Sequence, residues 1–462
     1  MVKLDPTRDG PDAPGGAVSP DRLPLSFNQE FLCMFDSDPE SGPFGPSYHI
    51  MLDRRLAGPI DQAALRGALL DLVRRHEALR TRIVRGVESP YQQVFPASPP
   101  RLEVRECPGV PHEERPRRAA AFLNELECSD VDADELPHVR PVIMYFDQED
   151  AVLALLMHHT AVDGWSLPVI ARDLVELYAA RCAGTPGDLP PVPQYRDFVA
   201  WERARAGSRS MTTAERYWAE ALRGAELTAL RCDHPRSAKL PPVTAAHRFV
   251  IPANLGTEVT RLARQARCSP FMVLLAAYYR LVQRLTGATD IVVSTHTPGR
   301  GNGLFDSAVG SFFNFVPLRT RLDEGTAGLE LLWRTRDTCL AAYAHDVPST
   351  RIFDAAPDLM AAAMRDDLAP VTFQALPFVP DSHPTTAGGV TFNPVPRPQT
   401  GNVPVTAQIP DGALWTLSFR ASGDIAVNVA YRTDRFDHQT IDRLAAEYQG
   451  TLETLTRELA GA

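Results

Sequence analysis

Seven consecutive residues combine two imidazoles, a carboxylate and a glycine at one point in the chain. They are His158-His159-Thr160-Ala161-Val162-Asp163-Gly164. A histidine titrates near neutral pH and can take a proton from a nucleophile. Asp163 could accept an arginine fork that fixes the segment, and the N–H of Gly164 could donate to an oxyanion. These residue types at this spacing therefore indicate acid–base chemistry.

Two other interpretations of the same residues remain open. Core histidines bonded to backbone carbonyls, with Asp163 as a helix cap, would explain each residue singly. A His-His-Asp set could also ligate a metal, but no second cluster of ligands is evident in the sequence. Side chains of adjacent strand residues point to opposite faces, so His158 and His159 cannot share a role. We therefore predict one structural and one outward-facing imidazole, and no bound metal.

The segments on either side of the motif predict where it lies in the fold. Residues 151–157 are all apolar, which is typical of a strand buried on both faces. Residues 167–180 carry apolar side chains at helical spacing. The polar residues therefore lie where a buried strand ends and a helix begins. Residues 61–76 and 437–459 are predicted to form further amphipathic helices.

The chain of 462 residues is too long for one ordinary core, so we predict two lobes. Strands and helices alternate in both halves, which indicates an α/β or α+β protein. Residues 1–22 are polar and rich in Pro, Gly and Asp, and we predict a disordered leader without a secretory signal. The Pro- and Gly-rich residues 184–193 are predicted to link an N-terminal lobe, 23–183, to a C-terminal lobe, 194–462.

Composition and charge argue against several classes of protein. The chain is 44% hydrophobic and 23% charged, and no apolar run reaches the roughly 18 residues of a membrane helix. The net charge of −10 argues against nucleic acid as a partner. The seven cysteines are scattered and include no CxxC pair, which favours reduced thiols in the cytoplasm over a disulfide framework or a zinc site.

The seven-residue motif matches the HHxxxDG motif of the condensation-domain superfamily of nonribosomal peptide synthetases. Other segments resemble further motifs of that family, in the same order, across residues 23–455. Residues 75–81, Arg-His-Glu-Ala-Leu-Arg-Thr, match RHExLRT in full. The other matching segments are Ser26-Phe27-Asn28-Gln29 with Asn in place of Ala, 195–201 with Tyr195 and Trp201, 309–314, and a weakened 344–348.

The resemblance implies two chloramphenicol-acetyltransferase-like lobes arranged in a V around a central channel. His159 would be the catalytic histidine and would face this channel, while His158 and Asp163 would be mainly structural. Asp163 would pair with an arginine, for which Arg300 is the first choice and Arg80 the second.

Two further segments are given roles by the same resemblance. The glycine-rich loop 299–306 would cross under the channel as a floor, and a strand within 378–408 would latch one lobe to the other. Structural roles are expected for Arg75, His76, Glu77, Arg80, Tyr195 and Trp201. A loose basic run fits either a solvated face or a contact with phosphopantetheine or an acidic carrier protein: Arg203, Arg205 and Arg209.

The reaction implied by the family is attack of an amine or hydroxyl on a thioester. The donor would be an acyl or aminoacyl group on the phosphopantetheine arm of a peptidyl or acyl carrier protein, with no other cofactor. The acceptor would be a small molecule or would itself be carrier-bound, and the product an amide or ester of antibiotic or other secondary metabolism. His159 would act as the base, and imidazolium or the Gly164 N–H would meet the oxyanion.

The chain has no adenylation signature and no Gly-x-Ser carrier attachment segment, so we expect a free-standing condensation enzyme. Two other functions are consistent with the family. One is a CoA-dependent O- or N-acyltransferase, which donor preference would distinguish. The other is a non-catalytic domain that recruits a carrier protein, against which the intact His159 and Asp163 argue.

Overall fold

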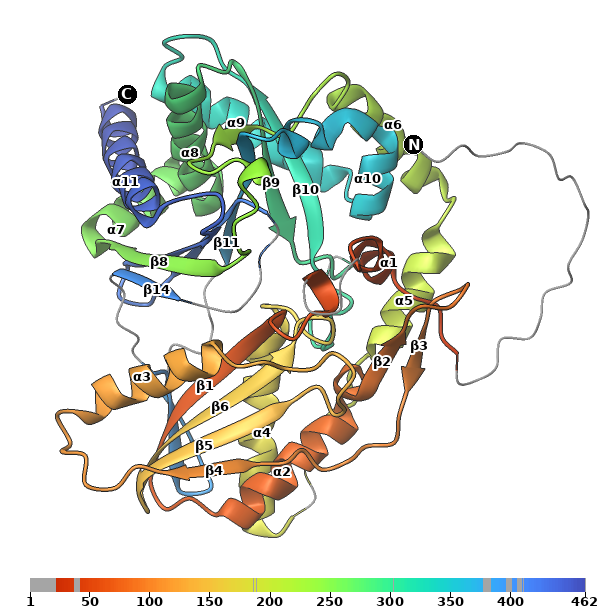
Figure 1. Cartoon of the computed structure of the whole chain (residues 1–462), viewed down its shortest axis with the longest axis vertical. Helices are drawn as coiled ribbons and strands as arrows, with labels where there is room; N and C mark the ends of the chain where they lie inside the picture. The colour runs from red at the N-terminus through yellow and green to blue at the C-terminus, as the bar shows by residue number, and fades with distance from the viewer. Residues whose placement is uncertain are drawn as a thin grey trace, which may run out of the picture.

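The structure, a computed structural model, describes residues 22–36, 42–185, 187, 189–301, 303–376, 384–395, 401–404, 409 and 411–461. The predicted leader, 1–22, lies outside the described residues except for Arg22. In this part of the chain the strands form two large sheets and one small hairpin (Figure 1). We call each large sheet with its covering helices a lobe.

The sheet of the N-terminal lobe has the strand order β12-β13-β1-β6-β5-β4. Its strands are β1 (His49–Ala57), β4 (Glu103–Glu106), β5 (Arg140–Asp147), β6 (Asp150–His158), β12 (Thr385–Ala387) and β13 (Val390–Asn393). The hairpin beside it is β2 (Thr81–Val84) with β3 (Tyr91–Val94). The helices of this half are α1 (Phe27–Met34), α2 (Gln62–Arg75), α3 (Arg115–Glu127), α4 (Ser166–Ala183) and α5 (Tyr195–Arg205), with 3₁₀ helices η1 (Gly42–Phe44) and η2 (Glu77–Arg80).

Strand β6 lies inside the N-terminal lobe and is buried along its whole length. Leu153, Leu155 and Met157 pack in the core that contains α2 and α4. Val152 and Leu156, on the opposite face, pack in the core that contains α3. Because successive strand residues face opposite sides, a strand covered on both faces must be apolar throughout. The structure thus confirms the prediction for residues 151–157 and explains their composition.

Helix α2 shows how local sequence sets the bounds of an element. The predicted helix 61–76 is observed as Gln62–Arg75, and Asp61 caps it. The Asp61 carboxylate accepts hydrogen bonds from the N–H groups of Ala63 at 2.8 Å and Ala64 at 2.9 Å. Such a side chain satisfies donors that have no partner within the helix. The apolar face of α2 then packs against α4 and the sheet.

The sheet of the C-terminal lobe has the order β10-β9-β11-β15-β16-β8-β14, and β7 pairs with β11. Its strands are β7 (Ala229–Arg231), β8 (Thr244–Ile251), β9 (Asp290–Thr297), β10 (Asn314–Arg321), β11 (Leu368–Leu376), β14 (Gly401–Pro404), β15 (Ala413–Phe419) and β16 (Ile425–Arg432). The helices are α6 (Arg209–Ala221), α7 (Ala253–Gln265), α8 (Pro270–Thr286), α9 (Gly328–Ala344), α10 (Ser349–Ala355) and α11 (His438–Ala460), with η3 (Arg236–Ala238), η4 (Pro357–Met360) and η5 (Ala362–Met364).

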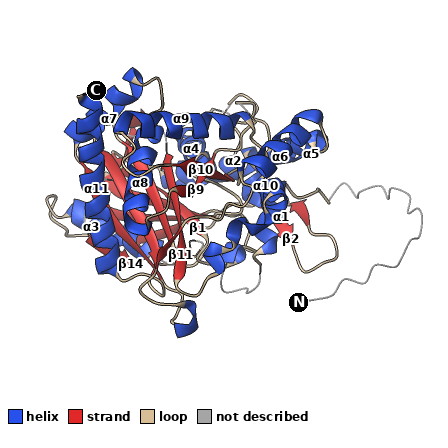
Figure 2. Ribbon diagram, turned by 90° about the horizontal axis from the view of Figure 1, so that it is seen from above, coloured by secondary structure: helices blue, strands red, loops and turns tan. Residues whose placement is uncertain are grey.

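Helices cover one face of this second sheet. Figure 2 shows α7, α8, α9 and α11 lying over the strands, and their apolar side chains share one core with the sheet. Side chains such as Phe373, Trp415 and Val427 point into that core. Residues of alternate register, including Gln374 and Thr416, are half-buried on the other face. The opposite face of the sheet is therefore more polar.

The N-terminal sheet is completed by strands from the other half of the chain. Strand β13 pairs antiparallel with β1, with Arg55 opposite Asn393, so a segment from the C-terminal half of the chain joins the N-terminal sheet. It appears as blue strands in the lower half of Figure 1. This pairing lies within residues 378–408, where we predicted a latch, although 377–383, 396–400 and 405–408 lie outside the described residues.

The division between the cores also differs from the predicted linker at 184–193. Tyr195, Phe198 and Val199 of α5 pack in the N-terminal core, together with Phe305 and Phe312. The apolar face of α5 therefore continues the first core beyond the Pro- and Gly-rich segment. Pro and Gly mark a break in regular structure, but the boundary of a core depends on where the next apolar face packs.

Candidate active site

The HHxxxDG segment forms the loop between β6 and α4. β6 ends at His158, and α4 begins at Ser166. Strand β1 lies alongside, with His49 opposite His158 in the ladder. The N–H of His159 donates to the carbonyl of Tyr48 at 2.8 Å, which fixes the first residue after the strand.

His158 is fully buried and both of its ring nitrogens have partners. Nε2 lies 3.2 Å from the carbonyl of Gly45, and Nδ1 lies 2.7 Å from the hydroxyl of Thr160. A carbonyl can only accept, so Nε2 carries the proton and Nδ1 accepts from the hydroxyl. Burial lowers the pKa of His158 to about 3, which keeps the ring neutral. This geometry supports a structural role.

His159 is only partly buried, and its two ring nitrogens differ. Nδ1 is buried, and no well-formed hydrogen bond satisfies it in the described part of the chain, while Nε2 is open to solvent. The ring stacks on Tyr48 at 4.9 Å between centroids and meets Phe313 edge-on at 5.5 Å. Burial lowers the pKa of His159, and the nearby backbone carbonyls and the charge of Asp163 oppose this only in part. At neutral pH the imidazole is therefore a free base.

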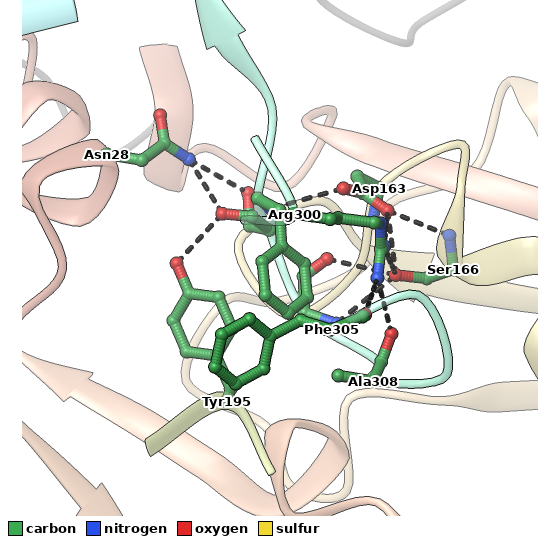
Figure 3. Close-up of polar contacts among 10 residues, drawn as sticks. Asn28, Asp163, Ser166, Tyr195, Arg300, Phe305 and Ala308 are labelled. Carbon is green, nitrogen blue, oxygen red and sulfur yellow. Dashed lines mark hydrogen bonds and ion pairs between the residues drawn. The ribbon is translucent and has the colours of Figure 1, made fainter. Parts of the chain in front are cut away.

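Both carboxylate oxygens of Asp163 accept hydrogen bonds from the protein, in contrast to the ring nitrogens of His159. Its Oδ1 accepts from Nη2 of Arg300 at 2.7 Å, and from the N–H and hydroxyl of Ser166 at 2.8 and 2.7 Å. Its Oδ2 accepts from the N–H of Phe312 at 3.2 Å. The side chain of Asp163 is 1% exposed and that of Arg300 5%. The pair is thus buried and extensively bonded (Figure 3).

Arg300 joins this pair to the loop 299–306. Its Nη1 donates to the carbonyls of Phe305 at 3.0 Å and Ala308 at 2.6 Å, as Figure 3 shows. The guanidinium also lies 4.2 Å above the centre of the Phe312 ring. The predicted floor loop is therefore tied to the motif of the N-terminal lobe, and the first-choice partner of Asp163 is the one observed.

The second-choice partner, Arg80, is not at the site. Its Nη1 donates to the carbonyl of Phe95 at 2.6 Å, and its guanidinium lies 3.5 Å from Glu77. η2 directs Arg80 toward the end of the β2–β3 hairpin, where the Phe95 N–H also bonds to the Arg80 carbonyl at 2.9 Å. The prediction that placed Arg80 beside Asp163 is therefore wrong.

Gly164 occupies an ordinary backbone conformation, because it is not among the positive-φ glycines of the described residues. A Cβ placed there would meet only the methyl groups of Leu376, at 3.8 and 4.0 Å. Steric packing therefore does not demand glycine at this position. In the described part of the chain no hydrogen bond is formed by its N–H, so the group is free to donate to a ligand.

Two other predicted segments converge on Ser311, two residues before Phe313. The hydroxyl of Tyr195 donates to the Ser311 carbonyl at 2.8 Å and lies 2.8 Å from the hydroxyl of Ser26. Nδ2 of Asn28 donates to the same carbonyl at 2.9 Å (Figure 3). The segment that carries Phe313 is thus held from α1 and α5. These contacts position one wall of the His159 environment.

The RHExLRT residues stabilise the N-terminal lobe at a distance from His159. Asp173 of α4 accepts from Arg75 at 2.7 Å, from His76 at 2.9 Å, and from Arg172. Burial alone would raise the pKa of Asp173, but the hydrogen bonds from His76, Arg75 and Arg172 lower it. Glu77 pairs with Arg196 of α5. This arrangement supports the structural roles that we predicted.

The loose basic run divides into different environments. Arg203 donates to the carbonyl of Leu25 at 2.9 and 2.6 Å and pairs with Glu30, so it holds the start of α1. Arg205 is exposed and lies 4.8 Å above the ring of Trp201. Arg209 is exposed on α6. Arg205 and Arg209 are thus exposed, whereas Arg203 is half-buried.

Sequence reasoning did not single out Tyr48, Phe313 or His296 as site residues. His296, near the end of β9, meets Phe313 edge-on at 5.5 Å, the ring that also contacts His159. The sequence held a signal for it, because a histidine at 296 follows shortly after the apolar run 291–293. Phe313 lies in the motif segment 309–314, whereas no pattern in the sequence marks Tyr48.

No group of three or more His, Cys, Asp or Glu side chains in the described ranges is placed to hold a metal ion. Within the same ranges no helix is both long enough and apolar enough to cross a membrane.

Residues 21–385 match the family model of the condensation domain. The chain belongs to the condensation-domain family. Condensation domains have two chloramphenicol-acetyltransferase-like lobes, and the predicted family and fold class are thereby confirmed.

Relatives of this condensation-domain protein include large synthetases. The chain is 33% identical over 337 residues to phosphinothricin tripeptide synthetase PhsC of Streptomyces viridochromogenes, covering 72% of this chain and 31% of that protein. It is 33% identical over 348 residues to the dimodular nonribosomal peptide synthase of Bacillus subtilis, covering 73% of this chain and 14% of that protein. It therefore spans less than a third of the length of either.

Two solved structures are similar over nearly the whole chain. The SgcC5 protein of Streptomyces globisporus, in complex with (R)-(-)-1-(2-naphthyl)-1,2-ethanediol and sucrose, has a TM-score of 0.88 and 43% identity, covering 94% of this chain and 98% of that one. The X-domain from teicoplanin biosynthesis, in complex with OxyB, has a TM-score of 0.74 and 25% identity, covering 97% of this chain and 96% of that one.

Proposed function

We propose that this protein joins a carrier-protein-bound acyl or aminoacyl thioester to a hydroxyl or amine acceptor, forming an ester or amide in natural-product biosynthesis. The observation that carries this proposal is the state of His159. Its imidazole is neutral, open at Nε2 and held between Tyr48 and Phe313. The neighbouring Asp163 has its carboxylate occupied by structural bonds and is not available for chemistry.

In the proposed reaction His159 accepts the proton of the nucleophile through Nε2 as the nucleophile attacks the thioester carbonyl. The negative charge develops on the carbonyl oxygen, where the N–H of Gly164 can donate to it. When the tetrahedral intermediate collapses, the carbon–sulfur bond breaks. The imidazolium then returns its proton to the departing thiolate, which leaves as the thiol of the phosphopantetheine arm.

Two lines of support bear on the substrates. The synthetase relatives support a natural-product pathway and a donor on a carrier protein. The SgcC5 structure contains a 1,2-diol, which supports a hydroxyl acceptor and therefore an ester product for this chain. No adenylation or resident cofactor chemistry is part of the proposal.

The test is product formation with matched donors. The protein is incubated with carrier proteins that each bear one amino acid or acyl group, and in parallel with the same groups on CoA. The acceptors are 1-(2-naphthyl)-1,2-ethanediol and 2-(2-naphthyl)ethylamine, and products are identified by mass spectrometry. We expect a carrier-dependent ester that is absent with His159→Ala. Faster turnover of the CoA thioesters would instead assign a CoA-dependent acyltransferase.

The similarity to an X-domain solved with OxyB favours a second candidate, a domain that recruits another protein. The same assay separates the two. No product with any donor, combined with stable binding of a loaded carrier protein, would favour recruitment and contradict the proposed chemistry.

A further inference from the structure

A second imidazole, from the other lobe, contacts the same phenylalanine as His159. His296 is the next-to-last residue of β9 in the C-terminal sheet. Its ring meets Phe313 edge-on at 5.5 Å and 86°, and the ring of His159 meets the same aromatic at 5.5 Å and 75°. The two lobes thus each contribute one histidine to the surroundings of a single phenylalanine.

The hydrogen bonds of His296 define which of its nitrogens carries a proton. Nε2 of Gln374 donates to the hydroxyl of Thr416 at 2.9 Å, which leaves the Gln374 Oε1 directed at His296. That oxygen lies 3.0 Å from Nδ1 of His296, and because an amide oxygen only accepts, Nδ1 must be the donor. In a neutral ring the lone pair then lies on Nε2.

His296 is neutral at physiological pH, since burial lowers its pKa to about 4. Nε2 has no hydrogen-bond partner in the described part of the chain, and it is not among the buried atoms that lack one. His296 therefore presents a solvent-accessible acceptor. This differs from His158, whose two nitrogens are both occupied by the protein.

The three bonded residues lie on neighbouring strands of one sheet face. Gln374 of β11 is directly opposite Thr416 of β15, and Ser294 bonds to Thr372 at 2.8 Å in the adjacent row. Leu376, on the same strand and face as Gln374, is the side chain that a Cβ on Gly164 would meet at 3.8 Å. The row thus borders the catalytic loop.

We propose that Nε2 of His296 accepts a hydrogen bond from a hydroxyl or amino group of the acceptor substrate other than the group that reacts. This rests on the proposed function and names a property of its acceptor: it carries a second hydrogen-bond donor. Gln374 and Thr416 are positioning residues, because they hold the tautomer that makes Nε2 an acceptor. The contact strengthens acceptor binding equally before and during the reaction, so its loss should raise the acceptor KM.

The test measures binding without turnover. Calorimetry compares two probes that share one skeleton, 1-(2-naphthyl)-1,2-ethanediol with two hydroxyls and 2-(2-naphthyl)ethanol with one. The wild-type protein is expected to bind the diol about tenfold more tightly, the size of one well-formed hydrogen bond. In His296→Asn the side-chain amide can still donate to Gln374, but no acceptor remains at the position of Nε2. The preference should then disappear.

Two further variants keep the result interpretable. His296→Gln can place an amide oxygen near the position of Nε2 and should retain part of the preference. Thr372→Val changes the adjacent polar row and should leave the preference intact. Equal affinity of the wild type for both probes, no binding of either, or an unchanged preference in both His296 variants would overturn the proposal.

Kinetics with an accepted donor add a second measurement. We expect His296→Asn to raise the KM for the diol about tenfold while the KM for the donor and kcat change little. An equal loss with both probes would indicate a structural role and contradict the proposal. The calorimetry requires no acyl donor. Absence of product would therefore refute the proposed function, while the role of His296 would still be decided by the binding measurements.

Discussion

The candidate site contains two regions whose polar side-chain atoms differ in hydrogen bonding. Around Asp163, the carboxylate, the Ser166 hydroxyl and the Arg300 guanidinium are bonded to one another and to backbone groups. Nε2 of His159, by contrast, has no protein partner in the described residues, and the same holds for Nε2 of His296. Burying a polar group without a partner is unfavourable, so a cluster whose polar atoms are nearly all bonded stabilises a fold; Nε of Arg300 is the buried atom of this cluster that lacks a partner in the described residues. Open groups are retained where a ligand completes them.

This difference separates residues that sequence motifs group together. His158, His159 and Asp163 belong to one seven-residue motif, yet two of them are occupied by structural bonds and one is not. The comparison predicts that substitutions in the saturated region lower stability first. Substitutions in the open region should lower activity first.

The largest expected effect is on catalysis, from His159→Ala. Removing a general base costs about 10²- to 10⁴-fold in rate, so we expect kcat/KM to fall by that factor while the melting temperature changes little. The matched variant is His158→Ala, which removes two buried hydrogen bonds and should destabilise the fold by about 1–3 kcal/mol. Similar stability losses from both variants, measured by denaturant unfolding, would remove the distinction between the two regions.

The next effect is on stability, from Arg300→Ala. It leaves the Asp163 carboxylate buried beside an empty space, and breaking a buried ion pair costs about 3–5 kcal/mol. Unfolding in urea should show this loss. Arg223→Ala is the control, since Arg223 forms an exposed pair with Glu220 whose side chains are 73% and 72% exposed, and it should change stability by less than about 0.5 kcal/mol. A small loss in Arg300→Ala would show that the cluster does not anchor the loop.

A pH effect of intermediate size follows from the buried histidines of the N-terminal lobe. Burial lowers the pKa of His138 to about 4 and that of His158 to about 3. The unfolded chain therefore binds protons at these rings below about pH 6.5 while the folded chain does not. Stability should be fully present above pH 6.5 and should fall as the pH drops toward 4, by up to about 1.4 kcal/mol per pH unit for each ring.

Denaturant unfolding between pH 7 and 4.5 measures this dependence, and His138→Asn isolates one ring from the titration of carboxylates. The variant should show a smaller slope than the wild type by up to one proton. An identical slope would mean that His138 is protonated in the fold, contrary to the burial that lowers its pKa, which the hydrogen bond to the Thr81 carbonyl at 2.9 Å opposes only in part.

The smallest expected effect is that of Tyr195→Phe. The ring still packs against Phe312 at 4.9 Å, but the hydroxyl that bonds to Ser311 and Ser26 is lost. We expect a loss of about 1 kcal/mol in unfolding free energy, with a modest loss of activity through the segment that carries Phe313. A change in kcat as large as that of His159→Ala would place Tyr195 in the chemistry instead.

Much of the local structure followed from patterns in the sequence. The apolar run before the motif predicted β6, and Asp61 with its amphipathic stripe predicted α2, because strand alternation and helix capping are local properties. The pairing of Asp163 with Arg300 was predicted through the family resemblance. The contacts of Arg80 were not predicted correctly, because a side chain at the end of a helix can turn toward several partners.

The lobe boundary shows where local patterns stop being sufficient. Pro and Gly residues in 184–193 mark a break in regular structure, but α5 returns its apolar face to the N-terminal core. Strand β13, within the predicted latch segment, pairs with β1 from the opposite end of the chain, Arg55 with Asn393. Neither packing partner can be read from the neighbourhood of the segment itself, because both depend on how distant elements meet.

The sequence alone determined that a proton-accepting motif lies at the end of a buried strand, and its similarity to other chains determined the family. Only the tertiary structure decided which polar atoms are occupied. His159 is the proposed base, and Tyr48 and Phe313 pack on its ring without bonding to its nitrogens. His296 contacts Phe313 as well, because the C-terminal sheet places the end of β9 next to that ring. Hydrogen-bond saturation is a property of three-dimensional neighbours, and no spacing along the chain encodes it.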